Sequence, residues 1–250
     1  MIASLMMYAR PELEAAHRRY WALIRDALAA RGIEAPEALS NEAEEFTVWE
    51  APDLILSQTC GMPYRLRLHG KVQLVGTPDF GVEGCQPGYY RSAIVVRADD
   101  PRRDLSAFRD TRFAYNQTIS QSGYAAPYAV AREHGFWFAN RVESGGHVKS
   151  AKAVALGHAD IAAIDAVTWQ FIKRYDDFAG HLRVLEWTPP TPGLPYITSL
   201  SMNAARIFDV VSDAIAQLAE DDRESLSLRG LVRIPAADYL AIANPPQTDS

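Results

Sequence analysis

The sequence has few cysteines, no long apolar run and no concentration of positive charge. Only two of its 250 residues are cysteine, and no stretch approaches the roughly 18 apolar residues of a membrane helix. The net charge is −6, and no basic stripe interleaved with aromatic residues is present. These absences argue against a membrane span and against a nucleic-acid partner. Any anion site must therefore be local and built largely from neutral donors.

The two cysteines, Cys60 and Cys85, each lie beside a glycine in a loop-like setting. With no paired histidine or further cysteine nearby they make a poor zinc site, so neither a metal nor a cofactor is expected. A disulfide between them would close a loop of about 25 residues and contribute about 3 kcal/mol on the loop-entropy model. That bond would fit an exported protein, whereas two reduced thiols would fit a cytosolic one. Both alternatives stay open.

The first seven residues, MIASLMM, are apolar but lack the basic segment and the small-residue cleavage site of a secretory signal. The segment therefore predicts a first strand over residues 2–8, ending at Tyr8. On this interpretation the chain is either cytoplasmic or the mature form of an exported protein.

Apolar strand-like runs alternate with amphipathic helical patterns along the chain. We expect strands at 53–59, 71–76, 89–97, 159–165 and 182–187, and helices at 11–31, 124–134, 147–156, 166–175 and 203–218. A shorter strand is expected at 46–49, and residues 244–250 are expected to be disordered. The alternation predicts an α/β protein with largely parallel sheets flanked by helices, which bind ligands at the carboxyl ends of their strands.

Two points where the chain crosses between lobes are predicted, near the strand at 92–97 and in the proline-rich segment at 187–195. They divide the chain into one lobe of residues 1–94 plus 192–250 and a second lobe of residues 95–191. A chain of this length can supply both lobes with cores of their own. The ligand is expected in a cleft between the two lobes.

One polar stretch, YNQTISQSGY at residues 115–124, follows a short strand and leads into a helix. That order gathers free backbone N–H groups and the positive end of a helix around an anion. Ser120, Gln121 and Ser122 add side-chain donors, and Gly123 lets the backbone approach closely. The plain alternative is an ordinary helix N-cap.

Further candidates lie at other strand ends and loops. His147 follows a glycine-rich loop, where it could donate to an oxyanion or simply cap a helix at the surface. Asp165 ends a strand, either as an acceptor in the pocket or as the N-cap of the next helix. Tyr8 and Thr59 lie at strand ends of the first lobe, where a pocket wall is expected, whereas Tyr64 is interpreted as a packing residue.

Four segments together resemble a known family: DLILSQTCG at 53–61, GYYRSAIVVR at 88–97, SQSGY at 120–124 and SGGHVKSAKAVALGHADIAAIDAVTW at 144–169. They are similar to the periplasmic phosphate-, phosphite- and phosphonate-binding components of ABC transporters. The resemblance implies the two-lobed periplasmic-binding-protein fold of the second topological type, with two crossover hinge segments. It also implies a periplasmic location, a small anionic ligand and an ABC-transporter permease as partner. We expect a monomer.

The resemblance further implies roles for single residues. The family's Ser-Thr-Ser-Gly loop, which cradles the phosphonate oxygens, matches Ser120, Gln121, Ser122 and Gly123, so a glutamine replaces the usual threonine. The family's pocket tyrosine matches Tyr90. Hinge closure is then expected to bring these donors around a tetrahedral oxyanion.

Two acidic positions of the family bear on the ligand. Asp165 matches the residue that can meet a ligand's amino group, but a second acidic residue, frequent in the family, is replaced here by Val148. One carboxylate for an ammonium group is therefore missing. Simple oxyanions are expected ahead of aminoalkylphosphonates.

Two alternatives use the same two-lobed fold. A cytosolic enzyme would need a nucleophile with a base in reach, and Cys60, His147 and Asp165 could form such a set if they converge. No nucleophile elbow, P-loop or metal-ligand spacing is present, however. A ligand-sensing regulatory lobe is the other alternative, although the chain carries no DNA-binding helix pair. The sequence favours a binding protein without catalytic residues.

Overall fold

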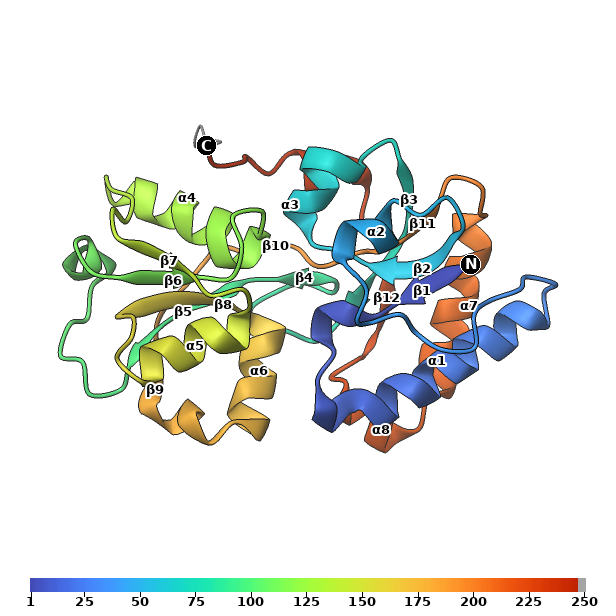
Figure 1. Cartoon of the computed structure of the whole chain (residues 1–250), viewed down its shortest axis with the longest axis horizontal. Helices are drawn as coiled ribbons and strands as arrows, with labels where there is room; N and C mark the ends of the chain where they lie inside the picture. Colours follow the sequence, from blue (N-terminus) through green and yellow to red (C-terminus); the bar gives the residue numbers. More distant parts are fainter. Residues whose placement is uncertain (247–250) are drawn as a thin grey trace. The chain divides into compact units, whose positions relative to one another are not determined.

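The structure, a computed structural model, describes residues 1–246, which fold into two compact units (Figure 1). The first unit comprises Met1–Tyr89 and Pro192–Ala241, and the second comprises Tyr90–Thr191 together with residues 242–246. The prediction of disorder at 244–250 falls partly on residues outside the described range. No helix of the described part is long and apolar enough to cross a membrane.

A five-stranded sheet forms the centre of the first unit, in the order β1-β2-β11-β3-β12. β1 is parallel to β2, β11 is antiparallel to β2 and β3, and β12 is antiparallel to β3. The strands are β1 (Ile2–Ser4), β2 (Leu54–Gln58), β3 (Val72–Asp79), β11 (Tyr196–Ser199) and β12 (Gly230–Val232). The helices are α1 (Glu14–Ala29), α2 (Glu45–Trp49), α3 (Gly61–Pro63), α7 (Ala204–Gln217), α8 (Glu220–Ser225) and α9 (Ala236–Leu240).

Helix α1 packs through one apolar face. Tyr20, Ile24 and Leu28 recur every four residues, which is the spacing of one helix face, and all three are buried. The helix lies against α7, and α7 in turn lies against β3 and β12. The long helix predicted at 11–31 is thus present, preceded by one 3₁₀ turn at Pro11–Leu13.

The residues at 46–49, predicted as a strand, form helix α2 instead. The Glu44 carboxylate accepts hydrogen bonds from the backbone N–H of Thr47 at 2.7 Å and from its hydroxyl at 2.9 Å. This N-cap satisfies a donor of the first turn and starts the helix. The prediction was wrong because it relied on the β-favouring composition of residues 46–49 and ignored the capping residue that precedes them.

The second unit is built on another five-stranded sheet, in the order β7-β6-β8-β5-β9. β6 is parallel to β7 and β8, and β5 is antiparallel to β8 and β9. Its strands are β5 (Ser92–Arg97), β6 (Phe113–Tyr115), β7 (Arg141–Glu143), β8 (Ile161–Asp165) and β9 (Leu182–Trp187), and its helices are α4 (Ala126–Glu133), α5 (His147–Ala155) and α6 (Ala166–Tyr175). Two short strands, β4 (Tyr89–Tyr90) and β10 (Thr191–Pro192), form a separate pair.

The α/β class is confirmed, but both sheets are mixed rather than largely parallel. β5 follows the first crossing of the chain between units and β11 follows the second, and each runs against both of its neighbours. Strands are expected to be parallel where a helical crossover joins them within one sheet. A strand that enters from the other unit is not bound by that rule, so its direction was not predictable from the alternation.

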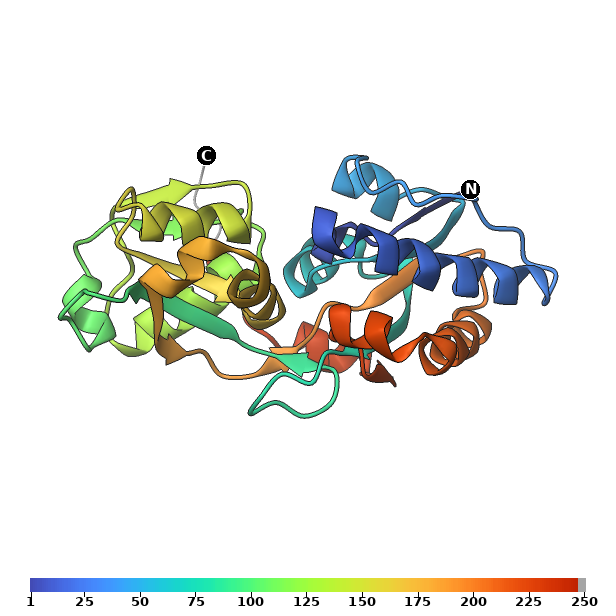
Figure 2. The same ribbon diagram turned by 90° about the horizontal axis from the view of Figure 1, so that it is seen from below.

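The core of the second unit follows the alternation of side chains along β5. Ala93 and Val95 pack on one face with residues of α5 and α6, whereas Ile94 and Val96 pack on the other with residues of α4. Figures 1 and 2 show α5 and α6 on one side of this sheet and α4 on the opposite side. A strand that is buried on both faces has a continuous apolar run in its sequence, and this run is why β5 was predicted as a strand.

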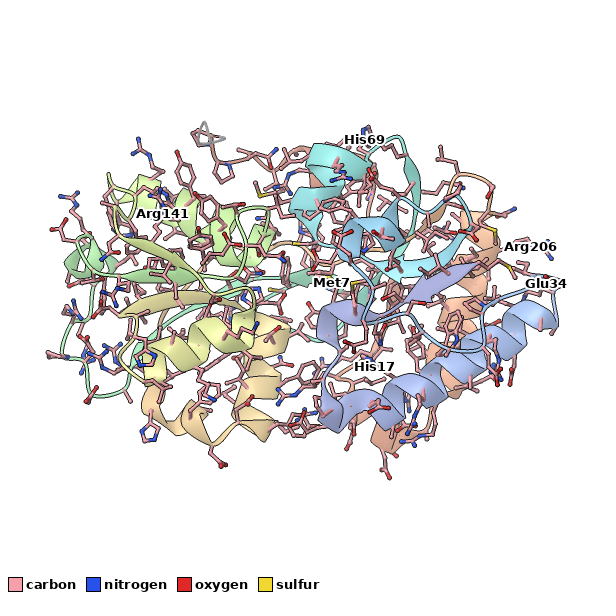
Figure 3. The ribbon with its side chains drawn as sticks, viewed as in Figure 1. Met7, His17, Glu34, His69, Arg141 and Arg206 are labelled. Atoms are coloured by element: carbon pink, nitrogen blue, oxygen red, sulfur yellow. The ribbon has the colours of Figure 1, made fainter. Side chains whose placement is uncertain are left out.

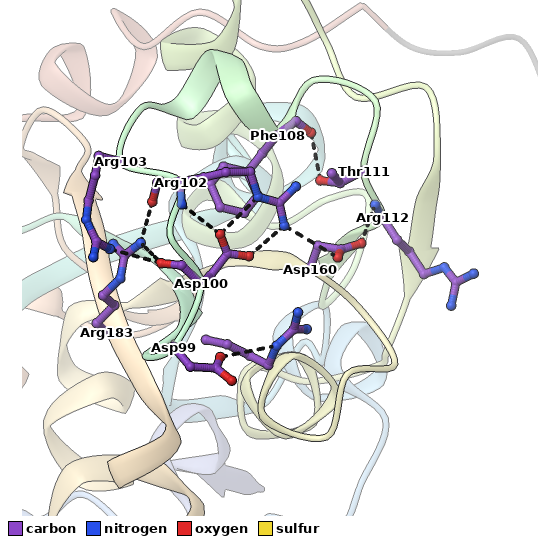
Figure 4. Close-up of polar contacts among 10 residues, drawn as sticks. Asp99, Asp100, Arg102, Arg103, Phe108, Thr111, Arg112, Asp160 and Arg183 are labelled. Carbon is purple, nitrogen blue, oxygen red and sulfur yellow. Dashed lines mark hydrogen bonds and ion pairs between the residues drawn. The ribbon is translucent and has the colours of Figure 1, made fainter.

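A charge network lies where β5 ends and β6 and β8 begin (Figure 4). The buried Asp100 carboxylate accepts from the Arg102 guanidinium at 3.0 Å and 2.6 Å. The same guanidinium stacks on the ring of Phe108 at 4.0 Å and reaches Asp160 at 3.8 Å. Asp160 accepts from the backbone N–H of Arg112 at 3.0 Å. The network therefore ties the loop after β5 to the starts of two neighbouring strands.

The network makes stability depend on pH in the acid range. Hydrogen bonds from Arg102 lower the pKa of Asp100 to about 2. Because the pKa is lower in the folded state, the contribution is complete above the unfolded pKa of about 4 and is lost as the pH falls toward 2. We expect urea unfolding to show a loss of about 1–2 kcal/mol from this group between pH 5 and pH 2.5. Asp100→Asn should lose less over that range, and an equal loss in both proteins would contradict the assignment.

Candidate functional site

Seven of the nine predicted binding residues fall in the second unit, at one end of its sheet. The carboxyl ends of β6 and β8 and the amino end of β5 meet there, because β5 runs antiparallel to β8. We call this end of the sheet the polar end. The residues placed at it are Tyr90, Ser120, Gln121, Ser122, Gly123, His147 and Asp165.

The SQSG segment begins a helix, as predicted. The Ser120 hydroxyl oxygen accepts from the backbone N–H of Gly123 at 3.0 Å, and the Ser120 carbonyl accepts from Tyr124 and Ala125. The first turn, Gln121–Ala125, is π-helical and continues directly into α4. Ser120 is thus an N-cap, as the plain alternative expected. An N-cap does not exclude an anion site, because a capped helix start still presents N–H groups of its first turn.

Ser122 joins three elements of the polar end. Its hydroxyl lies 2.8 Å from Nε2 of His147, the first residue of α5. Its carbonyl accepts from the hydroxyl of Ser92 at 2.9 Å, at the start of β5, and the backbone N–H of Ser92 donates to the Thr188 hydroxyl at 2.9 Å. Ser122 is therefore held by contacts on both its backbone and its side chain.

The glycine-rich loop before α5 brings His147 to Ser122. The backbone N–H of Ser144 donates to the Tyr115 carbonyl at 2.8 Å, and that of Gly145 donates to the Asn116 carbonyl at 3.0 Å. Gly145 has φ +78°, a left-handed conformation that favours glycine. These bonds fasten the start of α5 to the end of β6, so the histidine ring faces the SQSG turn.

The ring of His147 is neutral at physiological pH. Burial disfavours the imidazolium and lowers the pKa of His147 to about 4. A backbone hydrogen bond with Ala163 acts in the opposite direction, but its effect on the pKa is smaller than that of burial. The histidine therefore supplies a neutral donor and acceptor rather than a positive charge.

Gly123 is required for space rather than for backbone conformation. A Cβ atom built on it would lie 1.9 Å from Oδ1 of Asn116 and 3.1 Å from Cε1 of His147. Oδ1 of Asn116 is itself buried without a hydrogen-bond partner. The orphaned oxygen of Asn116 and the ring of His147 thus border the same glycine. Unpartnered buried polar atoms of this kind are expected where a ligand binds.

Asp165 is the N-cap of α6, one of the two roles expected from the sequence. Its Oδ1 accepts from the backbone N–H groups of Val167 at 2.7 Å and Thr168 at 2.9 Å, at the start of α6. The residue is buried and stands opposite Ser92 in the register of β8 and β5. Tyr90, also buried, precedes Ser92 by two residues.

Sequence reasoning missed Ser92 and Asn116. Asn116 lies inside the polar stretch that was singled out, so its position was available as a signal. Ser92 appears in the sequence only as a small polar residue before an apolar run. Its place beside Ser122 depends on the antiparallel register of β5, which no local pattern encodes.

Tyr8 lies in the first unit, at the end of a 3₁₀ turn rather than of a strand. β1 ends at Ser4, because the next backbone N–H, that of Leu5, donates to Oδ1 of Asn41 at 2.8 Å. The Tyr8 ring packs edge-on against Phe80, with 5.0 Å between ring centroids.

Thr59 also lies in the first unit, buried between β2 and α3. Its backbone N–H donates to the carbonyl of Pro195 at 3.0 Å. Cys60 follows it as the buried N-cap position of α3, whereas Cys85 lies in the loop between β3 and β4. Cys60 and Cys85 form no disulfide in the structure.

A separate cavity of about 970 Å³ lies in the first unit between α1 and residues 37–43. His17, labelled in Figure 3, forms part of its wall, and burial lowers the pKa of this histidine to about 4. None of the nine predicted binding residues lines the cavity. The candidate site therefore remains the polar end of the second sheet.

A comparison with known proteins identifies a family for this chain. The model of the family described as "ABC transporter, phosphonate, periplasmic substrate-binding protein" matches residues 58–239. A search of curated proteins found no match.

Solved structures with the same fold include three with similar coverage. PhnD1 from Prochlorococcus marinus in complex with methylphosphonate is 13% identical, with a TM-score of 0.72 over 95% of this chain and 93% of that one. XAC2383 from Xanthomonas citri bound to ATP is 16% identical, with a TM-score of 0.69 over 95% and 91%. PA3383 from Pseudomonas aeruginosa, a binding-protein component of a phosphonate ABC transporter, is 14% identical, with a TM-score of 0.69 over 96% and 82%.

Proposed function

The chain belongs to the family of periplasmic substrate-binding proteins of phosphonate ABC transporters, and we propose that it binds a small tetrahedral oxyanion at the polar end. The proposed ligand is a phosphonate, a phosphite or a phosphate-like anion. The observation that carries the proposal is the contact of Ser122 with His147 at the start of a capped helix turn. Because the family consists of substrate-binding proteins, a catalytic role for Cys60, His147 and Asp165 is not retained.

Neutral groups would replace the hydration shell of the anion. The first turn after Ser120 offers backbone N–H groups, and the side chains of Ser122 and His147 add donors. The neutral state of His147 leaves the charge of the ligand to be met by these dipoles. Tyr90 and Asp165 are proposed to complete the site, with Asp165 also retaining its role as helix cap.

Hinge closure remains part of the proposal. The chain passes between the units at residues 89–90 and 191–192, and we propose that these segments flex when the ligand binds. Tyr8 and Thr59 would be the contribution of the first unit. The proposed setting is the periplasm, with delivery of the ligand by a monomer to the permease of an ABC transporter.

A thermal-shift screen tests the proposal. Phosphate, phosphite, methylphosphonate, 2-aminoethylphosphonate, sulfate and ATP should be compared, since similar structures hold methylphosphonate and ATP. A ligand at 100 times its Kd adds about 2.7 kcal/mol to the free energy of unfolding. We expect a clear increase in Tm with one phosphorus oxyanion and a smaller effect of the aminoalkyl compound.

Ser122→Ala should weaken binding of that oxyanion by about tenfold or more, because a hydrogen bond to a charged group contributes about 1.5–3 kcal/mol. Ser106→Ala is the matched control. Ser106 is an exposed serine of the same unit whose hydroxyl also lies beside a histidine, at 3.4 Å from Nδ1 of His134. If Ser122→Ala and Ser106→Ala bind alike, the site lies elsewhere.

A further inference from the structure

Two arginines of the second unit, Arg103 and Arg183, bring their guanidinium groups to one carbonyl oxygen. Nη1 of Arg103 and Nη2 of Arg183 each donate to the backbone oxygen of Asp100, both at 3.0 Å. Nη2 of Arg183 also donates to the backbone oxygen of Arg102. Figure 4 shows the two guanidinium groups side by side next to Asp100. Two positive groups thus share backbone acceptors.

Neither of these arginines has a carboxylate partner among the described residues. The Asp100 carboxylate is occupied by Arg102 through two hydrogen bonds. Asp160 is shared between Arg102 and the backbone of Arg112, and Asp99 pairs with Arg97 at 3.7 Å. The network holds five arginines (Arg97, Arg102, Arg103, Arg112, Arg183) and three aspartates (Asp99, Asp100, Asp160), which leaves two positive charges over.

This surplus is local, since the whole chain carries a net charge of −6. Nε of Arg183 is buried and has no acceptor among the described residues. Burial, together with the positive charge of Arg103, lowers the pKa of Arg183, and the negative charge of Asp100 offsets this only in part. The pair therefore combines two neighbouring positive charges, neither in an ion pair among the described residues, with one buried N–H group that lacks an acceptor.

We propose that Arg103 and Arg183 form a second oxyanion site, separate from the polar end. Paired guanidinium groups suit a planar or tetrahedral anion that presents two or more oxygens, such as a phosphate group. The site lies at the carboxyl end of β5, whereas the polar end lies at the amino end of the same strand. The two sites can therefore be occupied and mutated independently.

The test uses inorganic phosphate and the full chain, with binding measured by calorimetry at low ionic strength. Ser122→Ala serves as the background, so that binding at the polar end is already weakened when the second site is measured. In this background Arg103→Gln and Arg183→Gln should each weaken phosphate binding by about tenfold or more. Arg132→Gln, which removes an exposed arginine of α4 in the same unit, should leave binding unchanged.

Arg103 is exposed, so its replacement tests the site with the least disturbance of folding. Without phosphate, Arg183→Gln removes one of two neighbouring like charges but also two hydrogen bonds to backbone carbonyls, so its Tm is measured as a control for folding. Equal phosphate affinity in the background and in both arginine variants would overturn the proposal, as would an equal loss in Arg132→Gln. The outcome does not depend on the ligand of the polar end, because the arginine variants leave the Ser122 region intact.

Discussion

Gly123→Ala is expected to weaken binding of the phosphorus oxyanion by about 100-fold, because it displaces two side chains of the site and a hydrogen bond to a charged group contributes about 1.5–3 kcal/mol. The added Cβ would lie 1.9 Å from Oδ1 of Asn116 and 3.1 Å from Cε1 of His147, so both side chains must move. The displacement would separate the histidine ring from the Ser122 hydroxyl, which now lies 2.8 Å from it. Calorimetric titration with the anion found in the screen measures the loss.

Gly180→Ala provides the control for this experiment. Gly180 lies in the same unit, and a Cβ built on it meets no atom within 4 Å. The double variant Asn116→Ala with Gly123→Ala removes the clashing amide and should bind more tightly than Gly123→Ala alone. Unchanged affinity in Gly123→Ala would show that neither Asn116 nor His147 contributes to the site.

Asp165→Ala is expected to lower the free energy of unfolding by about 2–3 kcal/mol, the largest effect on stability predicted here. The carboxylate accepts from the backbone N–H groups of Val167 and Thr168, and alanine leaves both without this acceptor. Because Asp165 is buried, water cannot readily take its place. Urea unfolding monitored by tryptophan fluorescence measures the change.

Asp165→Asn separates the structural role from binding. Asparagine is a good N-cap, so this variant should recover most of the stability while lacking the negative charge. If Asp165 also faces the ligand, Asp165→Asn should change the preference between methylphosphonate and 2-aminoethylphosphonate. A stability loss below about 0.5 kcal/mol in Asp165→Ala would contradict the capping role.

Local sequence was sufficient for most elements of the second unit. The helix predicted at 166–175 and the strand predicted at 182–187 have those bounds as α6 and β9. The strand predicted at 159–165 begins two residues later, at Ile161. These elements were predictable because their apolar periodicity is strong and their caps lie next to them in the chain.

Prediction failed where a partner distant in sequence or an overlooked neighbour decides the conformation. Residues 46–49 are helical because Glu44 caps them, although their composition favours a strand. The first strand stops at Ser4 because the side chain of Asn41, far along the chain, takes the next backbone N–H. The single strand expected at 89–97 divides at Arg91 into β4 and β5.

The candidate site likewise has a part that local sequence predicts and a part that depends on residues distant in sequence. The helix start at Ser120, with Ser122 and Gly123 in its first turn, was predictable from sequence, because its free backbone N–H groups fall within a few consecutive residues. The contacts of Ser122 with His147 and Ser92 join residues 25 and 30 positions apart. Such pairings follow from the antiparallel entry of β5 and the parallel pairing of β6 and β8.

By itself the sequence determined the α/β class, the helix start at Ser120 and the neutral character of its donors, since these depend on patterns within a few residues. Only the tertiary structure decided the mixed direction of the sheets, the neutral state of His147 and the space that Gly123 must leave for Asn116. The physical reason is that strand direction, burial and close contact depend on which segments meet. That choice is made by the packing of the whole unit rather than by any one segment.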